Sequence, residues 1–223
     1  MKSQTQPTVV IRAARENDTE RVRAFLDSER NALARIEFFY PYTEQELDAV
    51  VKGGDFYIAC KEDDTIVGSL GLDPDRSYAS DIAGRVRDCS SILQPQMCYE
   101  VSGLMVSPAQ RGAGLAGKLM RQVLERAQAR FPQDWICGVV QLENIASMRT
   151  FWKNGFVLGG IYAMGGAYDF GYFVRPTRAK ITAGTERTRV AMRDMNAHRD
   201  ALRSGLVGIA DSDGQIVYAD PIV

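Results

Sequence analysis

Histidine is nearly absent from this sequence, since His198 is the only one among 223 residues. A Ser-His-Asp triad needs a histidine with a carboxylate partner, and a histidine-based metal site needs several ligands at defined spacing. His198 lies in a polar, arginine-rich stretch that offers neither pattern. We therefore expect no catalytic triad and no metal site, and we interpret His198 as a solvated surface residue.

Paired cysteines and long apolar runs are also missing. The four cysteines, Cys60, Cys89, Cys98 and Cys137, show no Cys-x-x-Cys pairing, and three of them fall inside predicted strands. Buried free thiols of this kind suit a reducing cytoplasm. Residues 1–7 lack the apolar core of a secretion signal, and no run approaches the length that spans a bilayer. The sequence thus predicts a cytoplasmic protein without a membrane partner.

A net excess of charge is the third absence. The chain has 27 Lys and Arg residues against 28 Asp and Glu residues, which gives a formal net charge of −1. With charges so evenly balanced, the chain has no general electrostatic attraction to the phosphate backbone of a nucleic acid. We therefore expect no nucleic-acid partner. Because 45% of the residues are hydrophobic, the chain can nevertheless bury a full core.

A glycine-rich turn between a predicted strand and a predicted helix is the most informative segment. Residues 99–106 are mostly apolar, and residues 115–127 place apolar and charged side chains on opposite helical faces. Between them, Gly112 and Gly114 keep side chains away from the first-turn amides. Such amides lie at the positive end of the helix dipole and bind anions, so the turn is typical of a phosphate site. The residues concerned are Arg111, Gly112, Ala113, Gly114, Leu115, Ala116 and Gly117.

Two other phosphate motifs fit this turn less well. The dinucleotide fingerprint needs Gly-x-Gly-x-x-Gly, whereas Arg111 here precedes Gly-Ala-Gly. The Walker-type loop needs Gly-Lys-Ser or Gly-Lys-Thr, which is missing from this segment. Taken alone, the segment also allows a purely structural role for the glycines in a tight turn.

Two motifs in the same order carry a family resemblance. Residues 111–116 match Gln/Arg-x-x-Gly-x-Gly/Ala after a Val-x-Pro strand end, and residues 144–156 match Asn-x-x-Ala/Ser-x-x-x-aromatic followed by Gly-Phe. From about Val9 to Val174 the sequence resembles the GNAT superfamily of N-acetyltransferases. The resemblance implies acetyl-CoA as cosubstrate and an α/β fold, the GNAT fold, whose central mixed and mostly antiparallel sheet is flanked by helices.

The resemblance also implies which residues bind the cofactor. Residues 111–117 would hold the pyrophosphate, and main-chain groups of Leu104, Met105 and Val106 would bind the pantetheine arm. The second motif would add three residues beside the cofactor, namely Asn144, Ser147 and Phe151. Asn144 is equally suited to cap the helix that it begins.

Glu100 is the strongest candidate for catalysis. It is the only charge in the apolar strand 97–106, where an ionised group is costly unless it has a role or a partner. A carboxylate there can take a proton from an attacking amine, and its spacing to Val106 is similar to that of the general-base glutamate in the histone-modifying branch of the family. The alternative is that Glu100 pairs with Arg85 or Arg87.

The other catalytic assignments also rest on the resemblance. The backbone amide of Leu104 would stabilise the carbonyl oxygen, and Gly103 fits a bulge that separates this strand from the next. Phe151 stands where many relatives carry the tyrosine that protonates the leaving thiolate, which phenylalanine cannot do. Because a coenzyme A thiolate leaves readily, water or another hydroxyl can supply the proton, and Tyr162, Tyr168 and Tyr172 are possible substitutes.

The remaining pattern predicts alternating strands and helices. We expect strands at 8–13, 135–141, 156–164 and 167–174, a hairpin formed by 56–61 and 65–72, and helices that begin near residues 16 and 43. Residues 73–96 mix prolines, serines and charges of both signs, so we expect an inserted loop. The aromatic run 38–42 fits either the core or a wall of the acceptor pocket.

We divide the chain into an acetyltransferase domain, residues 1–175, and a C-terminal extension, residues 176–223. In the extension we expect a charged helix over 185–203 and a hairpin formed by 206–210 and 215–218. Such a helix is either a solvated face or a partner surface, which leaves a homodimer through the extension possible. No internal repeat is evident in the sequence.

The leading hypothesis is an N-acetyltransferase that moves an acetyl group from acetyl-CoA to a primary amine of a small molecule, with Glu100 as base. One alternative is a protein acetyltransferase acting on lysine or an N-terminus. Another is a regulatory module that binds acyl-CoA without turnover, which Phe151 favours and Glu100 opposes.

Overall fold

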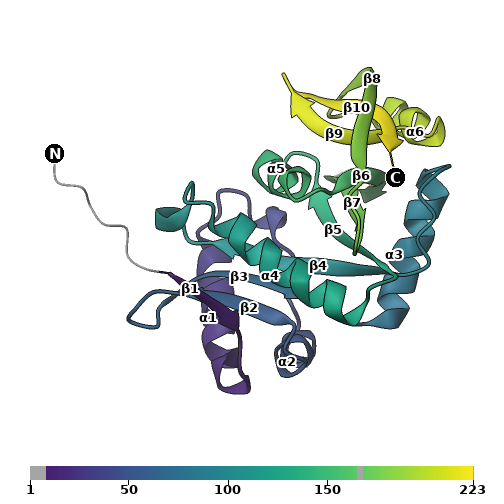
Figure 1. Ribbon diagram of the computed structural model, residues 1–223. Helices are drawn as coiled ribbons and strands as arrows, with labels where there is room; N and C mark the ends of the chain where they lie inside the picture. Colours follow the sequence, from purple (N-terminus) through teal and green to yellow (C-terminus); the bar gives the residue numbers. More distant parts are fainter. Residues whose placement is uncertain (1–8, 165–167, 223) are drawn as a thin grey trace. The chain divides into compact units, whose positions relative to one another are not determined.

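The computed structural model describes residues 9–164 and 168–222, which form two compact units (Figure 1). The first unit holds the chain up to Leu72 and then Gly103–Val123, and the second holds Asp73–Ser102 and the chain from Leu124 onward. Strand β4 (Cys98–Val106) and helix α4 (Leu115–Arg130) each begin in one unit and end in the other. The expectation about residues 1–7 lies outside the described residues.

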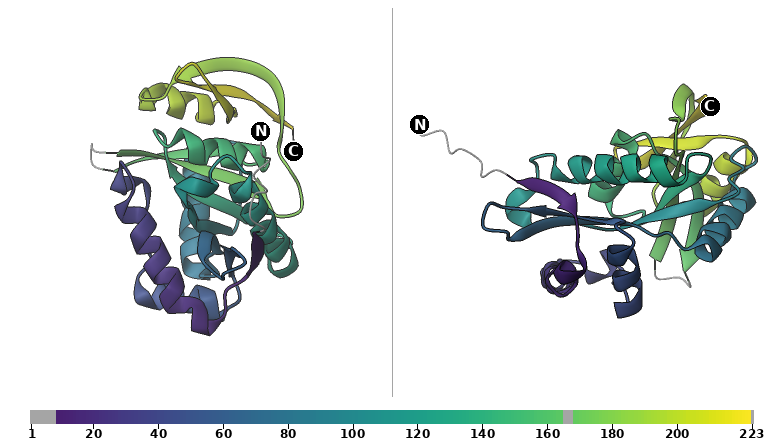
Figure 2. Two further views of the ribbon diagram at one scale, coloured as in Figure 1. Left: turned by 90° about the vertical axis from the view of Figure 1, so that its left-hand side faces the viewer. Right: turned by 60° about the horizontal axis from the view of Figure 1, so that its bottom comes forward.

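The first unit is built on an antiparallel sheet. Strands β1 (Val10–Ala13), β2 (Phe56–Cys60) and β3 (Ile66–Leu72) lie side by side in this order, and the end of β4 follows β3. The predicted hairpin of β2 and β3 is confirmed. Helices α1 (Thr19–Asn31) and α2 (Glu44–Lys52) cover one face of these strands, and the first part of α4 covers the other (Figure 2). Single 3-10 turns occur at Glu16–Asp18, Ile36–Phe38 and Pro108–Gln110.

Apolar residues at helical spacing explain why α1 and α2 pack on the sheet. Val22, Phe25 and Leu26 of α1 are buried with Phe56 and Ile58 of β2 in one core cluster. Helix α2 adds Leu47, Val50 and Val51 to the same cluster. The predicted capping box at its start is confirmed, because the Thr43 hydroxyl accepts from the amide of Glu46 and the Glu46 carboxylate accepts from the amide of Thr43.

The second unit contains the remaining strands in the order β4, β5, β7, β6, β9, β10, β8. Their bounds are β5 (Trp135–Gln141), β6 (Val157–Met164), β7 (Tyr168–Pro176), β8 (Thr182–Ala191), β9 (Val207–Ser212) and β10 (Gln215–Ile222). The pairing of β4 with β5 is parallel, and the pairings from β5 to β8 along this order are antiparallel. The three helices that belong wholly to this unit are α3 (Arg76–Cys89), α5 (Ile145–Lys153) and α6 (Met195–Arg203).

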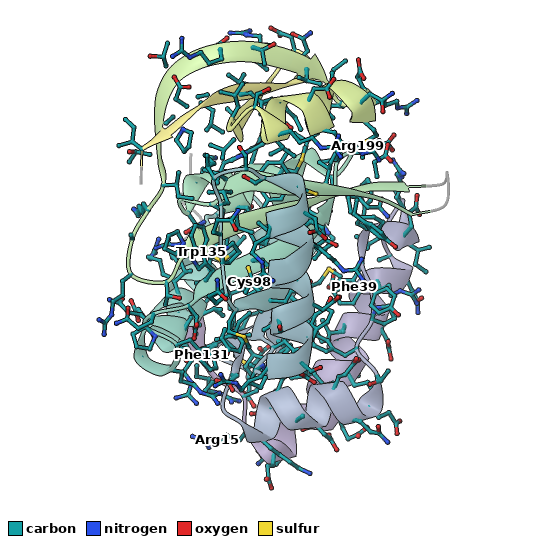
Figure 3. The ribbon with its side chains drawn as sticks, turned by 90° about the vertical axis from the view of Figure 1, so that its right-hand side faces the viewer. Arg15, Phe39, Cys98, Phe131, Trp135 and Arg199 are labelled. Carbon is teal, nitrogen blue, oxygen red and sulfur yellow. The ribbon has the colours of Figure 1, made fainter. Side chains whose placement is uncertain are left out.

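The prediction of a loop over residues 73–96 is wrong, because α3 occupies most of that segment. The Asp75 carboxylate caps the helix by accepting from the amides of Ser77 and Tyr78. Its buried positions, Ala79, Ile82, Ala83 and Val86, follow helical spacing and pack on the sheet of the second unit. Figure 3 shows α3 in front of the strands that carry Cys98 and Trp135.

The extension also differs from its prediction. Residues 182–191 form strand β8, so the expected helix over 185–203 is confirmed only in its second half, as α6. Strand β8 pairs with β10, and β9 and β10 form the expected hairpin around Asp213 and Gly214. The division of the chain into residues 1–175 and 176–223 stays a prediction, and the contacts group the extension with the other residues of the second unit.

His198 is not the surface residue that the sequence predicts. Its side chain is completely buried, with Nδ1 at 2.9 Å from the Tyr218 hydroxyl and Nε2 at 3.3 Å from the Met192 carbonyl oxygen. Burial lowers the pKa of the imidazole, which favours its neutral form. The ring therefore ties α6 to β10 from inside the second unit.

None of the helices in the described part of the chain combines the length and the hydropathy that crossing a bilayer requires.

Candidate active site

The glycine turn of the first unit has the open backbone that the sequence predicts. Gly112 and Gly114 have φ angles of +81° and +74°, a region that favours glycine. At both positions, and at Gly117, an added Cβ would meet no heavy atom within 4 Å. Helix α4 begins at Leu115, and the amide of Lys118 donates to the Gly114 carbonyl oxygen at 3.1 Å. The amides of the first helical turn before Lys118 therefore have no acceptor within the helix.

The strand end that leads into this turn is fixed by three hydrogen bonds. The Ser107 amide donates to the Val67 carbonyl oxygen at 3.0 Å, and the Ser107 hydroxyl donates to the Glu29 carboxylate at 2.6 Å. Arg111 folds back, so that its Nε donates to the Val106 carbonyl oxygen at 3.1 Å. The turn is thus anchored to β3, to α1 and to the end of β4.

The predicted pantetheine-binding stretch follows a kink at Gly103. Gly103 has a φ angle of +69°, and a Cβ there would lie 2.8 Å from Cε2 of Tyr42, so both backbone and space favour glycine. Ser69 fixes the kink by donating from its hydroxyl to the Gly103 carbonyl oxygen at 2.9 Å. The side chain of Met105 is buried in the core, and those of Leu104 and Val106 are half-buried.

A pocket of about 630 Å³ borders the start of the turn in the first unit. Helix α1 and the β2–β3 turn line it together with Ser107, Ala109 and Gln110, and its larger apolar side chains are Phe25, Ile66 and Val67. Its lining reaches Gln110 and includes none of the residues 111–117.

In the second unit, Glu100 lies where the ladder of β4 and β5 ends. The ladder has three residue pairs, and its last pair is Glu100 with Cys137. The backbone of Glu100 is held by the amide of Asp73, which donates to the Glu100 carbonyl oxygen at 2.8 Å. The thiol of Cys137 is buried, which raises its pKa and keeps it neutral.

Tyr78 of α3 donates a hydrogen bond from its hydroxyl to the Glu100 carboxylate. Although 42% of Tyr78 is exposed, burial of the hydroxyl and the nearby charge of Glu100 raise the pKa of the phenol. A neutral phenol remains a donor, so it holds the carboxylate in one orientation.

The alternative partners of Glu100 are engaged elsewhere. Arg85 donates to Asp81 at 2.8 Å, and Arg87 donates to the carbonyl oxygen of Pro95. The expectation of a pairing with Arg85 or Arg87 is therefore not what the structure shows.

The tyrosines proposed as substitutes for the missing acid differ in their surroundings. Tyr172 is buried, and burial raises its pKa to about 12 against the opposing effect of Arg85, which is hydrogen-bonded to it. Tyr162 is 37% exposed and has the Arg85 guanidinium 5.4 Å from its ring centre. The side chain of Tyr168 lies outside the described residues.

The second motif forms α5 as expected. Asn144 caps the helix by accepting from the amide of Ser147 at 3.2 Å, and Gly155 ends it with a φ angle of +80°. The capping role of Asn144 is thus observed, and a cofactor contact stays a prediction. Phe151 is buried, and its ring tip fills the space that a side chain at Gly138 would need.

The aromatic run 38–42 divides between core and surface. Phe39 is buried in the core of the first unit, and Tyr42 packs against the same cluster. Tyr40 is 88% exposed. The run therefore contributes mainly to the core, and Tyr40 is its exposed member.

Sequence reasoning missed Tyr78, the residue that contacts the candidate base. The signal was present as Asp75 before an Ala79, Ile82, Ala83 and Val86 pattern, which predicts a helix with Tyr78 in its first turn. The prolines on either side and the mixed charges obscured that pattern.

The residues present fit coenzyme A and offer nothing comparable for a metal ion. Open glycine positions and first-turn amides suit a diphosphate, which binds through backbone donors. Among the residues that the structure describes, no three His, Cys, Asp or Glu side chains are grouped to hold a metal.

Comparisons with known proteins agree with this assignment. The family model "Acetyltransferase (GNAT) family" matches residues 11–156. No curated protein matches the chain.

Solved structures with the same fold include three whose chains are almost fully covered. A polyamine N-acetyltransferase of Drosophila melanogaster is 19% identical with a TM-score of 0.58, over 76% of this chain and 100% of its own. The yncA protein of Salmonella typhimurium, solved with its cofactor acetyl-CoA, is 18% identical with a TM-score of 0.56, over 80% and 98%. An N-acetyltransferase of Staphylococcus aureus Mu50 is 16% identical with a TM-score of 0.54, over 76% and 99%. Because the family model covers most of the chain and the fold agrees, this chain belongs to the GNAT acetyltransferase family and is an acetyl-CoA-dependent N-acetyltransferase.

Proposed function

We propose that this enzyme moves the acetyl group of acetyl-CoA to the primary amine of a small molecule, with Glu100 as the general base. The observation that carries the proposal is the carboxylate of Glu100, which lies at the end of the β4–β5 ladder and accepts a hydrogen bond from Tyr78. Similar folds include a polyamine N-acetyltransferase and an agmatine N-acetyltransferase, which supports a small amine as acceptor.

The cofactor assignments divide along the chain. Backbone amides of residues 111–117 hold the pyrophosphate, and main-chain groups of Leu104, Met105 and Val106 bind pantetheine. The Leu104 amide donates to the thioester carbonyl oxygen and is the second catalytic group. Residues of α5 and its cap, Asn144, Ser147 and Phe151, complete the cofactor-binding set. Bound acetyl-CoA supplies an activated acyl group on a thiolate that leaves readily.

The chain's own contribution to the reaction is proton removal. Most primary amines are protonated at neutral pH and cannot attack a carbonyl carbon. Glu100 accepts the amine proton, directly or through one water, while the Tyr78 hydroxyl keeps its carboxylate oriented. Because Phe151 has no hydroxyl and its ring is buried, we assign the proton for the departing thiolate to water.

The substitution Glu100→Gln tests the base. It keeps the size and polarity of the side chain but cannot accept a proton, so kcat/KM at pH 7 should fall about 10²–10⁴-fold. The affinity for acetyl-CoA, measured by calorimetry, should not change. The loss should shrink near pH 10, where the amine itself is neutral. Unaltered turnover at pH 7 would remove Glu100 from the mechanism.

The same assay separates the other candidate functions. Release of free thiol from acetyl-CoA is followed with a panel of polyamines, amino acids and lysine-containing or free N-terminal peptides. Turnover with peptides alone would favour the protein acetyltransferase, and cofactor binding without thiol release for any acceptor would favour the binding module. The four thiols are free, which supports the proposed cytoplasmic location.

A further inference from the structure

The second unit contains the same substructure twice. Residues 135–176 form a strand, a helix and a hairpin, and residues 182–222 form a strand, a helix and a hairpin in the same order. Helices α5 and α6 have equal lengths, and each residue of α6 is numbered 50 above its counterpart in α5. Strands β6 and β9 begin at Val157 and Val207, again 50 residues apart. The sequence alone shows no evident repeat, and the order and spacing of these elements suggest one.

The details at the start of both helices repeat as well. Asn144 and Asp194 each cap their helix, and each accepts from the amide three residues later, at 3.2 and 3.0 Å. The amides of both caps donate to the carbonyl oxygen three residues earlier, each at 2.9 Å.

The helix ends repeat in the same way. Gly155 and Gly205 end the two helices with φ angles of +80° and +85°. Between residues 140 and 157, four positions hold identical residues at this offset: Val140 and Val190, Arg149 and Arg199, Gly155 and Gly205, Val157 and Val207. The match has no gap from residue 140 to residue 157, so one backbone pattern is used twice.

The two copies meet as the subunits of a twofold-symmetric dimer would meet. The strand order β5, β7, β6, β9, β10, β8 reads the same from either end once equivalent strands are exchanged. Strands β6 and β9 pair antiparallel through Leu158 and Gly208, two positions that are 50 apart. Glu143 and Arg193, also 50 apart, form an ion pair at 2.8 Å. Contact between equivalent positions is the signature of a twofold axis.

The boundary between the two copies, where β6 pairs with β9, is called the seam below, and each copy packs its helix on the strand of the other copy. Helix α5 packs on β9 and helix α6 packs on β6. The Trp152 indole donates to the Gly208 carbonyl oxygen at 3.0 Å, and a Cβ at Gly208 would lie 2.9 Å from that of Leu158. Arg149 binds Asp211 through two hydrogen bonds of 2.8 and 2.6 Å, and the Asp211 side chain is only 10% exposed.

The second copy keeps the architecture but not the cofactor residues. The positions equivalent to Asn144, Ser147 and Phe151 hold Asp194, Ala197 and Ala201. A carboxylate at the cap and two short side chains are a poor match for an anionic cofactor. Residues 177–222 also contain no Arg-x-x-Gly-x-Gly/Ala sequence.

We infer that residues 182–222 are a partial second copy of residues 135–176 that takes the place of a partner subunit. The extension covers the β6 edge, which would otherwise present unpaired backbone groups to a second chain. The enzyme then acts as a monomer with one acetyl-CoA site per chain. This differs from the homodimer through the extension that the sequence left possible.

The oligomeric state of the full chain is the first test. Sedimentation and native mass spectrometry should give a single species near the chain mass of 24.7 kDa, with one acetyl-CoA per chain, at all concentrations used for activity. A stable dimer at those concentrations would overturn the inference.

A charge exchange tests whether the seam lies within one chain. Arg149→Asp and Asp211→Arg should each lower Tm by roughly 2–4 °C, and the double variant should recover most of the loss. Mixing the two single variants should leave Tm at its lowered value, because neither chain carries opposite charges at positions 149 and 211. Restoration on mixing would show that the contact joins two chains and would overturn the inference, as would single variants that leave Tm unchanged.

The control exchanges an ion pair that lies within a single helix. Arg85 and Asp81 form a one-turn pair within α3 at 2.8 Å, and this pair does not join the two copies. Arg85→Asp and Asp81→Arg should change neither the mass of the particle nor its response to mixing. Because these readouts are mass and Tm, they stand apart from the test of Glu100 as base.

Discussion

At the scale of single residues, the Glu100 carboxylate and the Tyr78 hydroxyl form the pair on which the proposed chemistry depends. They come from different elements, β4 and α3, and are brought together in the second unit. A hydrogen bond donated to an ionised carboxylate stabilises its charged form. Tyr78 is thus a positioning residue, and it also keeps Glu100 ready to accept a proton.

Removal of that hydroxyl should shift the pH profile of the enzyme. In Tyr78→Phe the carboxylate loses a donor, so its protonation becomes easier and the acid limb of kcat/KM moves to higher pH. We expect turnover at pH 7 to fall several-fold, while the affinity for acetyl-CoA stays the same. Steady-state rates between pH 5 and 10 measure the shift.

Tyr162→Phe is the matched control for this change. Tyr162 is exposed to a similar extent, at 37% against 42%, and its ring lies near Arg85. Its profile should coincide with that of the unmodified enzyme. A Tyr78→Phe profile that also coincides, or that changes in height without a shift along the pH axis, would assign Tyr78 a purely structural role.

Phe151, which stands where many relatives carry a catalytic tyrosine, is packed in the core against Gly138. The Phe151 ring lies so close to the β5 backbone that a Cβ at Gly138 would be 2.1 Å from its Cζ. Phe156 and Phe173 enclose the same ring, with centroid distances of 4.9 and 5.7 Å. Position 151 therefore serves the core of the second unit, whatever contact it makes with the cofactor.

At the scale of elements, the sequence predicted best where one pattern operates alone. The strand β5 was predicted with its observed bounds, and the capping box of α2 and the glycine turn before α4 follow from local rules. The open backbone of the turn was predictable for the same reason, because a positive φ angle and glycine are directly linked, and its binding of a diphosphate stays a prediction.

Helix α3 and strand β8 were missed because tertiary packing decides them. In α3 only four positions are buried and the other face is charged, so its mean composition is that of a loop. In β8 a single residue, Val190, is buried, and arginines at exposed positions hide the alternation of a strand. Its extended conformation comes from pairing with β10, and no local sequence pattern predicts that pairing. His198 was misplaced for a related reason, since its partner Tyr218 lies 20 residues away.

The glycine turn also offers a test at this scale. Gly117 lies inside α4, in open space, so glutamate and glutamine can both replace it without backbone strain. Either substitution should favour the helix, because glycine is a poor helix former. If the turn binds a diphosphate, Gly117→Glu adds a repelling charge that Gly117→Gln lacks.

We therefore expect Gly117→Glu to bind coenzyme A about tenfold or more weakly than Gly117→Gln, with the difference shrinking in high salt. Calorimetry with coenzyme A measures both constants, and the thermal midpoints of the two free proteins serve as the control for folding. Equal affinities would contradict the phosphate assignment, because the two variants differ in charge alone.

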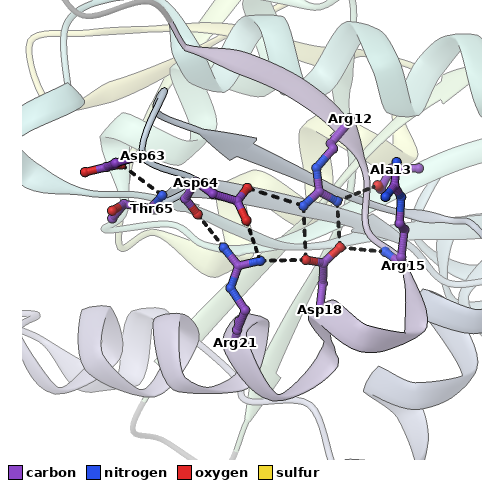
Figure 4. A network of polar contacts seen from close by, with 8 residues as sticks. All are labelled: Arg12, Ala13, Arg15, Asp18, Arg21, Asp63, Asp64 and Thr65. Atoms are coloured by element: carbon purple, nitrogen blue, oxygen red, sulfur yellow. Dashed lines mark hydrogen bonds and ion pairs between the residues drawn. The ribbon is translucent and has the colours of Figure 1, made fainter.

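At the scale of the whole molecule, stability in acid depends on groups that are buried in a fixed ionisation state. His198 is the only histidine, and burial lowers its pKa, so its neutral form is fully favourable above pH 6.5 and costs stability as the pH falls below that value. Asp18 in the first unit also loses stability in acid, at lower pH, although its buried form is the charged one. It is 2% exposed and accepts from Arg12 at 2.6 Å, from Arg21 at 2.9 Å and from the Arg15 amide at 2.9 Å (Figure 4).

The Asp18 network should therefore produce a separate step of acid destabilisation. Hydrogen bonds from Arg12, opposed by burial, lower the pKa of Asp18 from 3.8 to about 2. A lowered pKa means that the folded state favours the carboxylate. The ionised group therefore contributes about 2 kcal/mol to the free energy of unfolding above pH 4, and this contribution is lost as the pH falls toward 2. In urea titrations, the gap in unfolding free energy between the unmodified chain and Asp18→Asn should be largest above pH 4 and should close toward pH 2.

The control is Asp48→Asn, at an exposed carboxylate 3.9 Å from Lys52. The pH dependence of its unfolding free energy should stay parallel to that of the unmodified chain. A gap for Asp18→Asn that is independent of pH would mean that the network stabilises the first unit through packing rather than through the charge of Asp18.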